Sequence, residues 1–206
     1  MMRLGGLRIP APRSMLLVAV VLLLTGCYLP VRFDAEIEIT RYGTYNLIFD
    51  GYMVSVPLYD GLRKNDIKTA EEKEKVEVLR RDLTRDSATK RASYSGKGRF
   101  NVHWQKSGDL MEDPMITFLR RNQAFLTIKL LRTNGQVTIE AVSLTKEQEQ
   151  RLAAIGLGME GQIRIKTQAR VIDHNASHIT DDAERFYVWD VRGLDSPLPR
   201  MVLSLR

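Results

Sequence analysis

The chain of 206 residues contains a single cysteine, and common catalytic patterns are missing from it. One thiol leaves no partner for an intramolecular disulfide, so an exported domain of this chain must be held together by its hydrophobic core. Neither the G-x-S-x-G pattern of serine hydrolases nor the H-E-x-x-H pattern of zinc proteases occurs. Carboxylates are plentiful, but nothing in the sequence pairs two of them across a cleft, as glycosidases require. We therefore predict a protein that is not an enzyme and uses no cofactor.

Long apolar runs are also missing, because the most apolar stretch, residues 15–24, has only ten residues. As a helix it spans about 15 Å, roughly half of a hydrocarbon core of about 30 Å. Arg3, Arg8 and Arg13 precede it, and the first acidic residue is Asp34. A basic segment followed by a short apolar one is typical of a secretory signal peptide. An uncleaved N-terminal anchor helix and an ordinary signal peptide cut nearby are the alternatives.

Residues 24–27, Leu-Thr-Gly-Cys, resemble the lipobox of bacterial lipoproteins. In that family the cysteine thiol receives a diacylglyceryl group, and the signal peptide is then cleaved in front of it. The resemblance implies that residues 1–26 are a signal peptide, that residues 27–206 form an extracytoplasmic domain, and that Cys27 is the lipid attachment site. Two or more acyl chains such as palmitate anchor a protein stably, at about 0.8 kcal/mol per buried CH₂. We expect membrane lipid as a partner through Cys27 and a location in the cell envelope.

The net charge of the predicted extracytoplasmic domain is close to zero. Residues 1–26 hold three of the 31 basic residues and none of the 25 acidic ones, so the remaining 180 residues carry a net charge of about +3. Much of the excess behind the whole-chain pI of 9.5 is therefore removed with the signal peptide. A nearly neutral domain gives no support for nucleic acid as a partner.

Hydrophobic periodicity predicts one α+β domain with a largely antiparallel sheet and two or three helices packed on it. Alternation of apolar and polar residues predicts strands at 31–40, 44–56, 92–105, 124–132, 136–143, 162–173, 185–191 and 200–205. Gly96 and Gly98 are expected to form a bulge or bend. Helical spacing predicts helices at 65–84, 113–119 and 145–155, the last with Thr145 and Gln148 as a capping box.

The two ends of the domain resemble the LppM-like lipoprotein domain. The C-terminal stretch has a strand that runs into a His-Asn-Ala turn at 174–176, then a Tyr-x-Trp strand at 187–189 and a closing apolar strand. At the other end, an alternating strand follows directly after the lipobox. The resemblance implies an envelope-associated, non-catalytic domain that contacts lipids or glycolipids. Some relatives carry a transmembrane helix after the domain; here none is expected, so Cys27 would be the sole anchor.

Residues 156–161 match the dinucleotide pattern G-x-G-x-x-G letter by letter. That fingerprint requires a strand before it and a helix that opens within it. Here a predicted helix precedes the glycines and a predicted strand follows them. The segment is therefore interpreted as a helix C-cap and turn.

Asp173, His174 and His178 raise the possibility of a metal site. A His-x₃-His pair binds metal when both residues share a helical face, whereas these lie in a predicted loop between strands. Asp173 and Asn175 are turn formers whose side chains bond to nearby backbone. We therefore interpret these residues as structural and expect no metal.

Two features suggest contact with lipid. The aromatic residues of the first predicted hairpin are expected near the tether, where amphipathic rings suit a membrane interface, although cross-strand packing explains them as well. These residues are Tyr42, Tyr45, Phe49 and Tyr52. With Met111, Met115 and Phe118 they are also the candidate lining of an apolar pocket of about 300–1,000 Å³ in a lipid or glycolipid carrier.

The charged helix at 65–84 has two interpretations, a basic arm on anionic lipid and a solvated helix with one narrow buried face. Mixed charge favours the solvated helix. The main functional hypothesis is a membrane-anchored binding or structural lipoprotein whose partner is a lipid, a glycolipid or an envelope protein. The carrier is the alternative. A third hypothesis is an envelope hydrolase with a site dispersed over loops, which predicts a cleft with perturbed pKa values.

Overall fold

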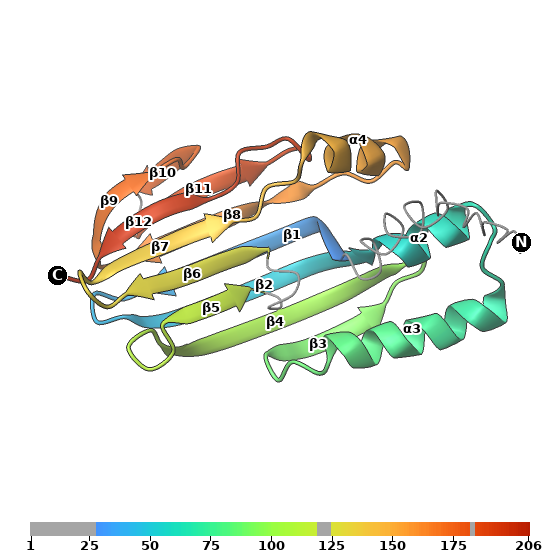
Figure 1. Ribbon diagram of the computed structural model, residues 1–206, viewed down its shortest axis with the longest axis horizontal. Coiled ribbons are helices and arrows are strands. Elements are labelled where there is room, and N and C mark those ends of the chain that lie inside the picture. The colour runs from blue at the N-terminus through green and yellow to red at the C-terminus, as the bar shows by residue number, and fades with distance from the viewer. Residues whose placement is uncertain (1–27, 119–124, 182–183) are drawn as a thin grey trace, which may run out of the picture.

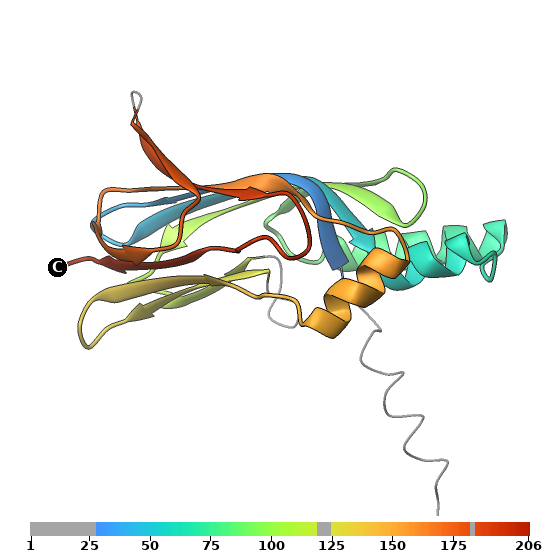
Figure 2. The same ribbon diagram turned by 90° about the horizontal axis from the view of Figure 1, so that it is seen from above.

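The computed structural model describes residues 28–118, 125–181 and 184–206. Two β-sheets pack face to face, with helices gathered toward one end of the resulting sandwich (Figures 1 and 2). Sheet A has seven strands in the order β10-β11-β8-β1-β2-β4-β3, and sheet B has five in the order β5-β6-β7-β12-β9. The strands are β1 Tyr28–Ile39, β2 Thr44–Ser55, β3 Thr89–Tyr94, β4 Arg99–Asp109, β5 Met115–Phe118, β6 Leu126–Leu131, β7 Gln136–Ala141, β8 Glu160–Thr167, β9 Arg170–His174, β10 His178–Asp181, β11 Arg185–Val191 and β12 Arg200–Ser204.

The long β1–β2 hairpin is the centre of sheet A. β2 pairs antiparallel with β1, and β8 lies parallel to β1 on its other side, with Ile37 opposite both Leu47 and Ile165. These three side chains are at most 3% exposed, whereas their neighbours Glu36 and Arg164 point to the outer face. Alternation along each strand thus separates a buried inner face from a polar outer face.

Aromatic rings join the two sheets in the core. Phe49 of β2 contacts Phe118 of β5 at a centroid distance of 5.3 Å, and Trp104 of β4 meets the same ring at 4.8 Å. Phe33 of β1 packs edge-on against Phe125 at 5.5 Å. Edge-to-face and tilted pairs of this kind add to the stabilisation from apolar burial.

The prediction of a single sheet is wrong, and the predicted strand 162–173 shows why. It is two strands, β8 in sheet A and β9 in sheet B, separated by a bend at residues 168–169. The Thr167 hydroxyl donates to the Ile39 carbonyl at 2.8 Å and accepts from the Ala169 amide at 3.0 Å, which stabilises the bend. The alternating pattern continues across it because each sheet buries one face against the other, so periodicity alone cannot reveal the change of sheet.

Three other boundaries differ from prediction for local reasons. The predicted helix 113–119 is strand β5, in which Ile116 and Phe118 alternate with more exposed residues; residue 119 lies outside the described part. Strand 44–56 ends at Ser55, and helix α2 (Val56–Arg63) begins there with Pro57 in its first turn. The predicted strand 92–105 is a hairpin of β3 and β4, since Gly96 and Gly98 have positive φ and form its turn.

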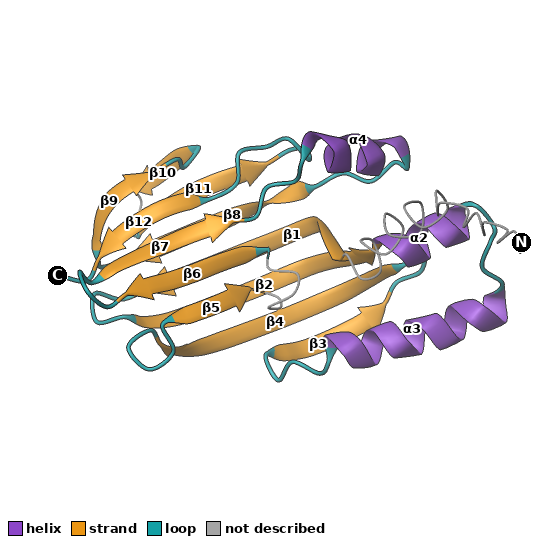
Figure 3. Ribbon diagram, viewed as in Figure 1, coloured by secondary structure: helices purple, strands orange, loops and turns teal. Residues whose placement is uncertain are grey.

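The helices also differ in part from prediction. Helix α3 (Thr69–Leu83) begins four residues after Asn65, and it buries only Val76 and Leu83, which agrees with a solvated helix with one narrow buried face. Helix α4 (Lys146–Ala154) has the predicted capping box of Thr145 and Gln148. α2 and α4 lie at the end where β1 begins, and α3 extends from there along the β3 edge of sheet A (Figure 3).

Candidate functional site

The end of the sandwich at which β1 begins is named the anchor end, because the segment predicted to be a lipobox precedes it. It consists of the start of β1, the end of β2, the β3–β4 turn, α2 and α4. Cys27 and the predicted signal peptide lie outside the described residues, and β1 begins at the next residue, Tyr28, whose hydroxyl donates to the Leu79 carbonyl of α3 at 3.3 Å. Within the described ranges, no helix has the length and apolarity to cross a bilayer.

The expectation that the first-hairpin aromatics lie near the tether is wrong for Tyr42. Tyr42 is 66% exposed in the β1–β2 turn, at the opposite or far end of the sandwich. A strand of 12 residues separates it from Tyr28, which corresponds to about 40 Å. Tyr45 and Phe49 face the core, and Tyr52 pairs with Arg32 near the anchor end. An antiparallel hairpin necessarily places its turn one strand length from its start.

The residues suggested as the lining of an apolar pocket do not lie together. Phe49 and Phe118 are buried and touch each other between the sheets. Met111 and Met115 are 54% and 45% exposed on the surface. These four residues are therefore divided between core and surface.

A groove with a volume of about 390 Å³ lies on the outer face of sheet A. β11 pairs with β8 only as far as Tyr187, whereas its pairing with β10 continues to Arg185. The β10–β11 hairpin therefore leaves the sheet and projects from the sandwich (Figure 2). Side chains of this hairpin form one wall of the groove. The lining residues come from β8, the hairpin and its tip: Gln162, Arg164, His178, Thr180, Glu184, Phe186 and Val188.

Three outward side chains of β8, those of Gln162, Arg164 and Lys166, each bond to an acidic partner. Gln162 Nε2 donates to Asp190 Oδ1 at 3.0 Å, and Arg164 Nη2 donates to Glu36 Oε2 at 3.0 Å. Lys166 Nζ lies 2.6 Å from Glu184 Oε1, and this hydrogen bond raises the pKa of Lys166 above its ordinary value. The basic groups of β8 are therefore neutralised in place.

The rest of the groove combines an aromatic ring with an apolar floor. The Arg164 guanidinium lies 5.8 Å from the centre of the Phe186 ring, within the range of a cation–π contact. Val188 at the bottom is 1% exposed and stands outside the main hydrophobic core. His178 Nδ1 is 3.5 Å from Asp190 Oδ2. Sequence reasoning identified only His178 among the lining residues, because the others appear in the sequence as ordinary outward strand positions.

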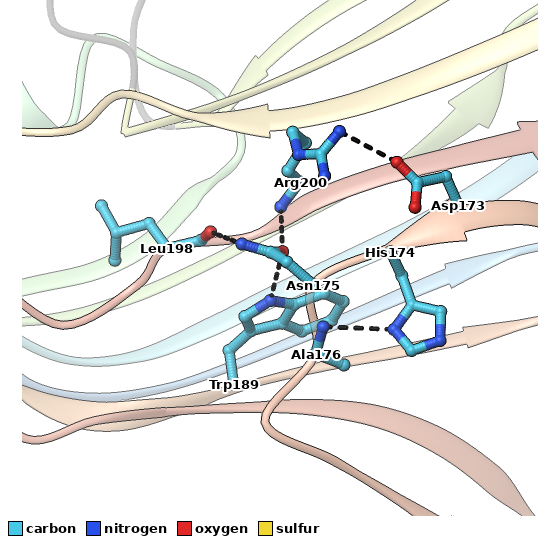
Figure 4. A network of polar contacts seen from close by, with 7 residues as sticks. All are labelled: Asp173, His174, Asn175, Ala176, Trp189, Leu198 and Arg200. Carbon is cyan, nitrogen blue, oxygen red and sulfur yellow. Dashed lines mark hydrogen bonds and ion pairs between the residues drawn. The ribbon is translucent and has the colours of Figure 1, made fainter.

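The prediction that His174 and His178 lie in a loop is wrong, because His174 ends β9 and His178 begins β10, in different sheets. His174 Nδ1 accepts a hydrogen bond from the Ala176 amide at 3.2 Å (Figure 4). The His174 ring also packs edge-on against the Tyr187 ring. Asp173 pairs with Arg200 at 2.9 Å. Among the described residues, no group of three or more His, Cys, Asp or Glu side chains is placed to hold a metal ion.

Asn175 is the centre of this polar network (Figure 4). Its Oδ1 accepts from the indole Nε1 of Trp189 and from the backbone amide of Arg200, both at 2.8 Å. Its Nδ2 donates to the Leu198 carbonyl at 3.0 Å. One side chain thus ties the β9–β10 connection to β11 and to the start of β12, which gives the His-Asn-Ala turn and the Tyr-x-Trp strand a structural reason to occur together.

The glycines at 156–161 have the predicted structural role. Gly156 has a φ of +79° and ends α4, with its amide bonded to the Ala153 carbonyl. β8 begins at Glu160, so the order helix, turn, strand is the reverse of a dinucleotide site. A Cβ at Gly161 would lie 2.2 Å from the Phe33 carbonyl oxygen, so glycine is required for the close approach of β8 to β1.

No protein-family model and no curated protein matches the sequence. Among solved structures, the chain is similar to the NMR structure of the folded domain of LppM from Mycobacterium tuberculosis. The identity is 14%, the TM-score is 0.41, and the match covers 84% of this chain and 87% of the LppM chain.

Proposed function

We propose that the protein is a membrane-anchored lipoprotein of the bacterial envelope that acts as a non-catalytic binding or structural module. The observation that carries the proposal is the position of β1, which begins at Tyr28, directly after the lipobox cysteine. With no linker between them, acyl chains on Cys27 would hold the anchor end against the bilayer. The groove on sheet A would then face sideways, away from the membrane surface.

A non-catalytic role agrees with the chemistry of the groove. A catalytic acid or base usually has a pKa shifted by burial or by a specific charged neighbour in a cleft. The pKa of Lys166, beside the groove, is raised, which keeps the amine protonated. The main cause is its hydrogen bond with Glu184 in an exposed ion pair. A cation in such an ion pair can hold neighbouring side chains in place, but it is poorly suited to proton transfer.

A lipid or glycolipid carrier is the second candidate function. Its binding site would be the cluster of aromatic rings between the sheets, in which Phe118 contacts Phe49, Trp104 and Phe125, and these buried rings would have to separate to admit an acyl chain. Titration of the protein with a pyrene-labelled fatty acid tests it, with Phe49→Ala as the variant. Saturable binding that this variant changes would support the carrier; fluorescence that rises without saturation would contradict it.

Labelling of the full-length protein in bacteria with an alkyne-bearing fatty acid tests the anchor. Because Cys27 is the only cysteine, Cys27→Ala should lose the label and leave the membrane fraction. Tyr28→Phe, one residue away, is the matched control and should keep both. Mass spectrometry should find an acylated Cys27 as the first residue. A labelled Cys27→Ala protein, or a membrane-bound product that retains Met1, would contradict the proposal.

A further inference from the structure

We propose that the groove between β8 and the β10–β11 hairpin binds a neutral saccharide of roughly one or two sugar rings. This inference rests on the proposed role as a binding module and names its ligand class. It assigns a ligand to residues on the outer face of sheet A, away from both the anchor end and the aromatic core.

The charges around the groove argue for a neutral ligand. Arg164 is paired with Glu36, and Lys166 is paired with Glu184 at 2.6 Å and lies 3.8 Å from Glu38. An anion in the groove would be attracted by these cations but repelled by the carboxylates paired with them. A cation would be attracted by the carboxylates and repelled by Arg164 and Lys166. A ligand without net charge avoids both repulsions and leaves the ion pairs intact.

The hydrogen-bonding groups suit hydroxyls, each of which both donates and accepts. Gln162 and Arg164 are already oriented by their bonds to Asp190 and Glu36, so they lose little side-chain freedom when a ligand binds. Glu184 adds an acceptor on the hairpin side. The side chains of Gln162 and Arg164 are planar and keep further donors or acceptors, so each can bond to two adjacent hydroxyls of a sugar.

The Phe186 ring supplies the complementary apolar contact. It is partly exposed, has the Arg164 guanidinium over it at 5.8 Å from the ring centre, and lines the groove together with the buried Val188. The face of an aromatic ring is electronegative, and the C–H bonds on one face of a hexose are weakly positive, so the two stack favourably. The volume of about 390 Å³ lies at the small end of the range of about 300–1,000 Å³ for small-molecule sites.

NMR titration of the acylated full-length protein tests the proposal, in micelles of a detergent without a sugar headgroup. The probes are maltose, cellobiose, mannobiose and chitobiose, with inorganic phosphate and spermidine as charged comparisons. A second arm uses nanodiscs with and without digalactosyldiacylglycerol, which separates a free saccharide from a lipid-linked one. We expect saturable shifts at the amides of Gln162, Arg164 and Phe186 with at least one disaccharide, in the millimolar range.

Three single variants make the result specific to the groove. Phe186→Ala and Gln162→Ala should each weaken binding by about 3- to 10-fold. Gln105→Ala, on β4 of the same outer face, is the matched control and should leave the affinity unchanged. The indole signal of the buried Trp189 reports that each variant is folded.

Shifts that require the glycolipid nanodiscs would support the proposal and identify a lipid-linked source. The proposal is overturned if no saccharide in either arm shifts these amides, if both groove variants bind as the parent protein does, or if phosphate or spermidine shifts them more than every saccharide. An acylated protein without saccharide shifts would leave the anchor proposal standing. Saccharide binding by a protein that is not acylated would support the saccharide site and contradict the anchor proposal.

Discussion

At the scale of single residues, Asn175 connects more of the fold than its exposed position indicates. Trp189 is fully buried, and its indole N–H has the Asn175 Oδ1 as its partner. A buried donor that loses its partner costs about 1–3 kcal/mol. The sequence shows a turn-forming asparagine here, but its bonds reach Leu198 and Arg200, more than 20 residues away.

Asn175→Ala should therefore lower the free energy of unfolding by about 1–3 kcal/mol, because it leaves the Trp189 indole without an acceptor. Asn175→Asp is the control: it keeps the acceptor oxygen for the indole but turns a second acceptor toward the Leu198 carbonyl. Because position 175 is exposed, solvent screens that repulsion, and the loss should be smaller than for Asn175→Ala. Denaturant unfolding followed by tryptophan fluorescence measures both. Equal losses for the two variants would show that the acceptor oxygen is unimportant.

The candidate site is less visible in the sequence than the fold is. The strand predicted at 162–173 implies by its period of two that Gln162, Arg164 and Lys166 share one face, as they do in β8. Their assembly with Glu36 and Phe186 depends on the pairing of β8 with β1 and β11. The Arg164–Glu36 contact spans 128 residues of chain, and no local pattern encodes a separation of that length.

At the scale of elements, α4 is the helix whose start the sequence specifies best. The Thr145 side chain accepts from the Gln148 amide at 3.2 Å, and the Gln148 side chain accepts from the Thr145 amide at 2.8 Å. No residue within α4 is fully buried, and its apolar contact with the core is made by the partly buried Leu152. We infer that the cap stabilises this helix more than tertiary contacts do.

Thr145→Ala should cost about 0.5–2 kcal/mol of stability, with the loss concentrated in α4. Thr145→Ser keeps the hydroxyl acceptor and should retain most of the stability. Hydrogen exchange of the α4 amides localises the effect, and denaturant unfolding gives its size. If the α4 amides exchange at the same rate in Thr145→Ala as in the parent, the cap is not what holds the helix.

Helix α3 is attached to sheet A through a half-buried tyrosine. The Tyr94 hydroxyl donates to Glu72 of α3 and accepts from the Gly98 amide at 3.0 Å. Burial, with the Glu72 hydrogen bond as a second cause, raises the pKa of Tyr94 from 10.0 to about 12. The folded state therefore holds this proton more tightly than the unfolded state does, so its contribution is complete below pH 10 and is lost between about pH 10 and 12.

Tyr94→Phe should be less stable than the parent near neutral pH by about 1–3 kcal/mol, because the buried Gly98 amide loses its partner. Between pH 10 and 12 the parent should lose more stability than the variant, so the two curves converge. Tyr42→Phe, which removes an exposed tyrosine, should follow the parent throughout. Urea unfolding across this pH range measures the difference, and parallel curves for Tyr94→Phe and the parent would contradict the assignment.

At the scale of the whole molecule, the direct connection of Cys27 to β1 determines how an acylated protein would stand on a membrane. The anchor end includes the β3–β4 turn with Lys97, because Ser55 bonds to the Gly98 carbonyl at 2.9 Å. Tyr42 lies at the far end, about 40 Å away along strands of 12 residues. A sandwich held by its first residue should extend away from the bilayer.

Fluorophores at the two ends test this orientation. If Cys27 is acylated, Tyr42→Cys and Lys97→Cys each introduce the only free thiol in the protein. A dye at position 97 should be quenched strongly by acceptors in the bilayer surface, and a dye at position 42 should be quenched far less. Equal quenching would show that the sandwich lies flat or is held elsewhere.

The features that the sequence alone could predict are local: the single cysteine behind a short apolar segment, the alternation that forms strands, the bend at Gly96 and Gly98 and the Thr145 capping box. Each depends on residues within about one turn or one strand, so one stretch of chain contains all the information. Only the tertiary structure decided that there are two sheets, that Tyr42 lies far from the anchor end, and that the β10–β11 hairpin forms a groove with β8. These features depend on which strands pair, and the free energy of that choice comes from apolar contacts between segments more than 100 residues apart, such as Ile37 and Ile165.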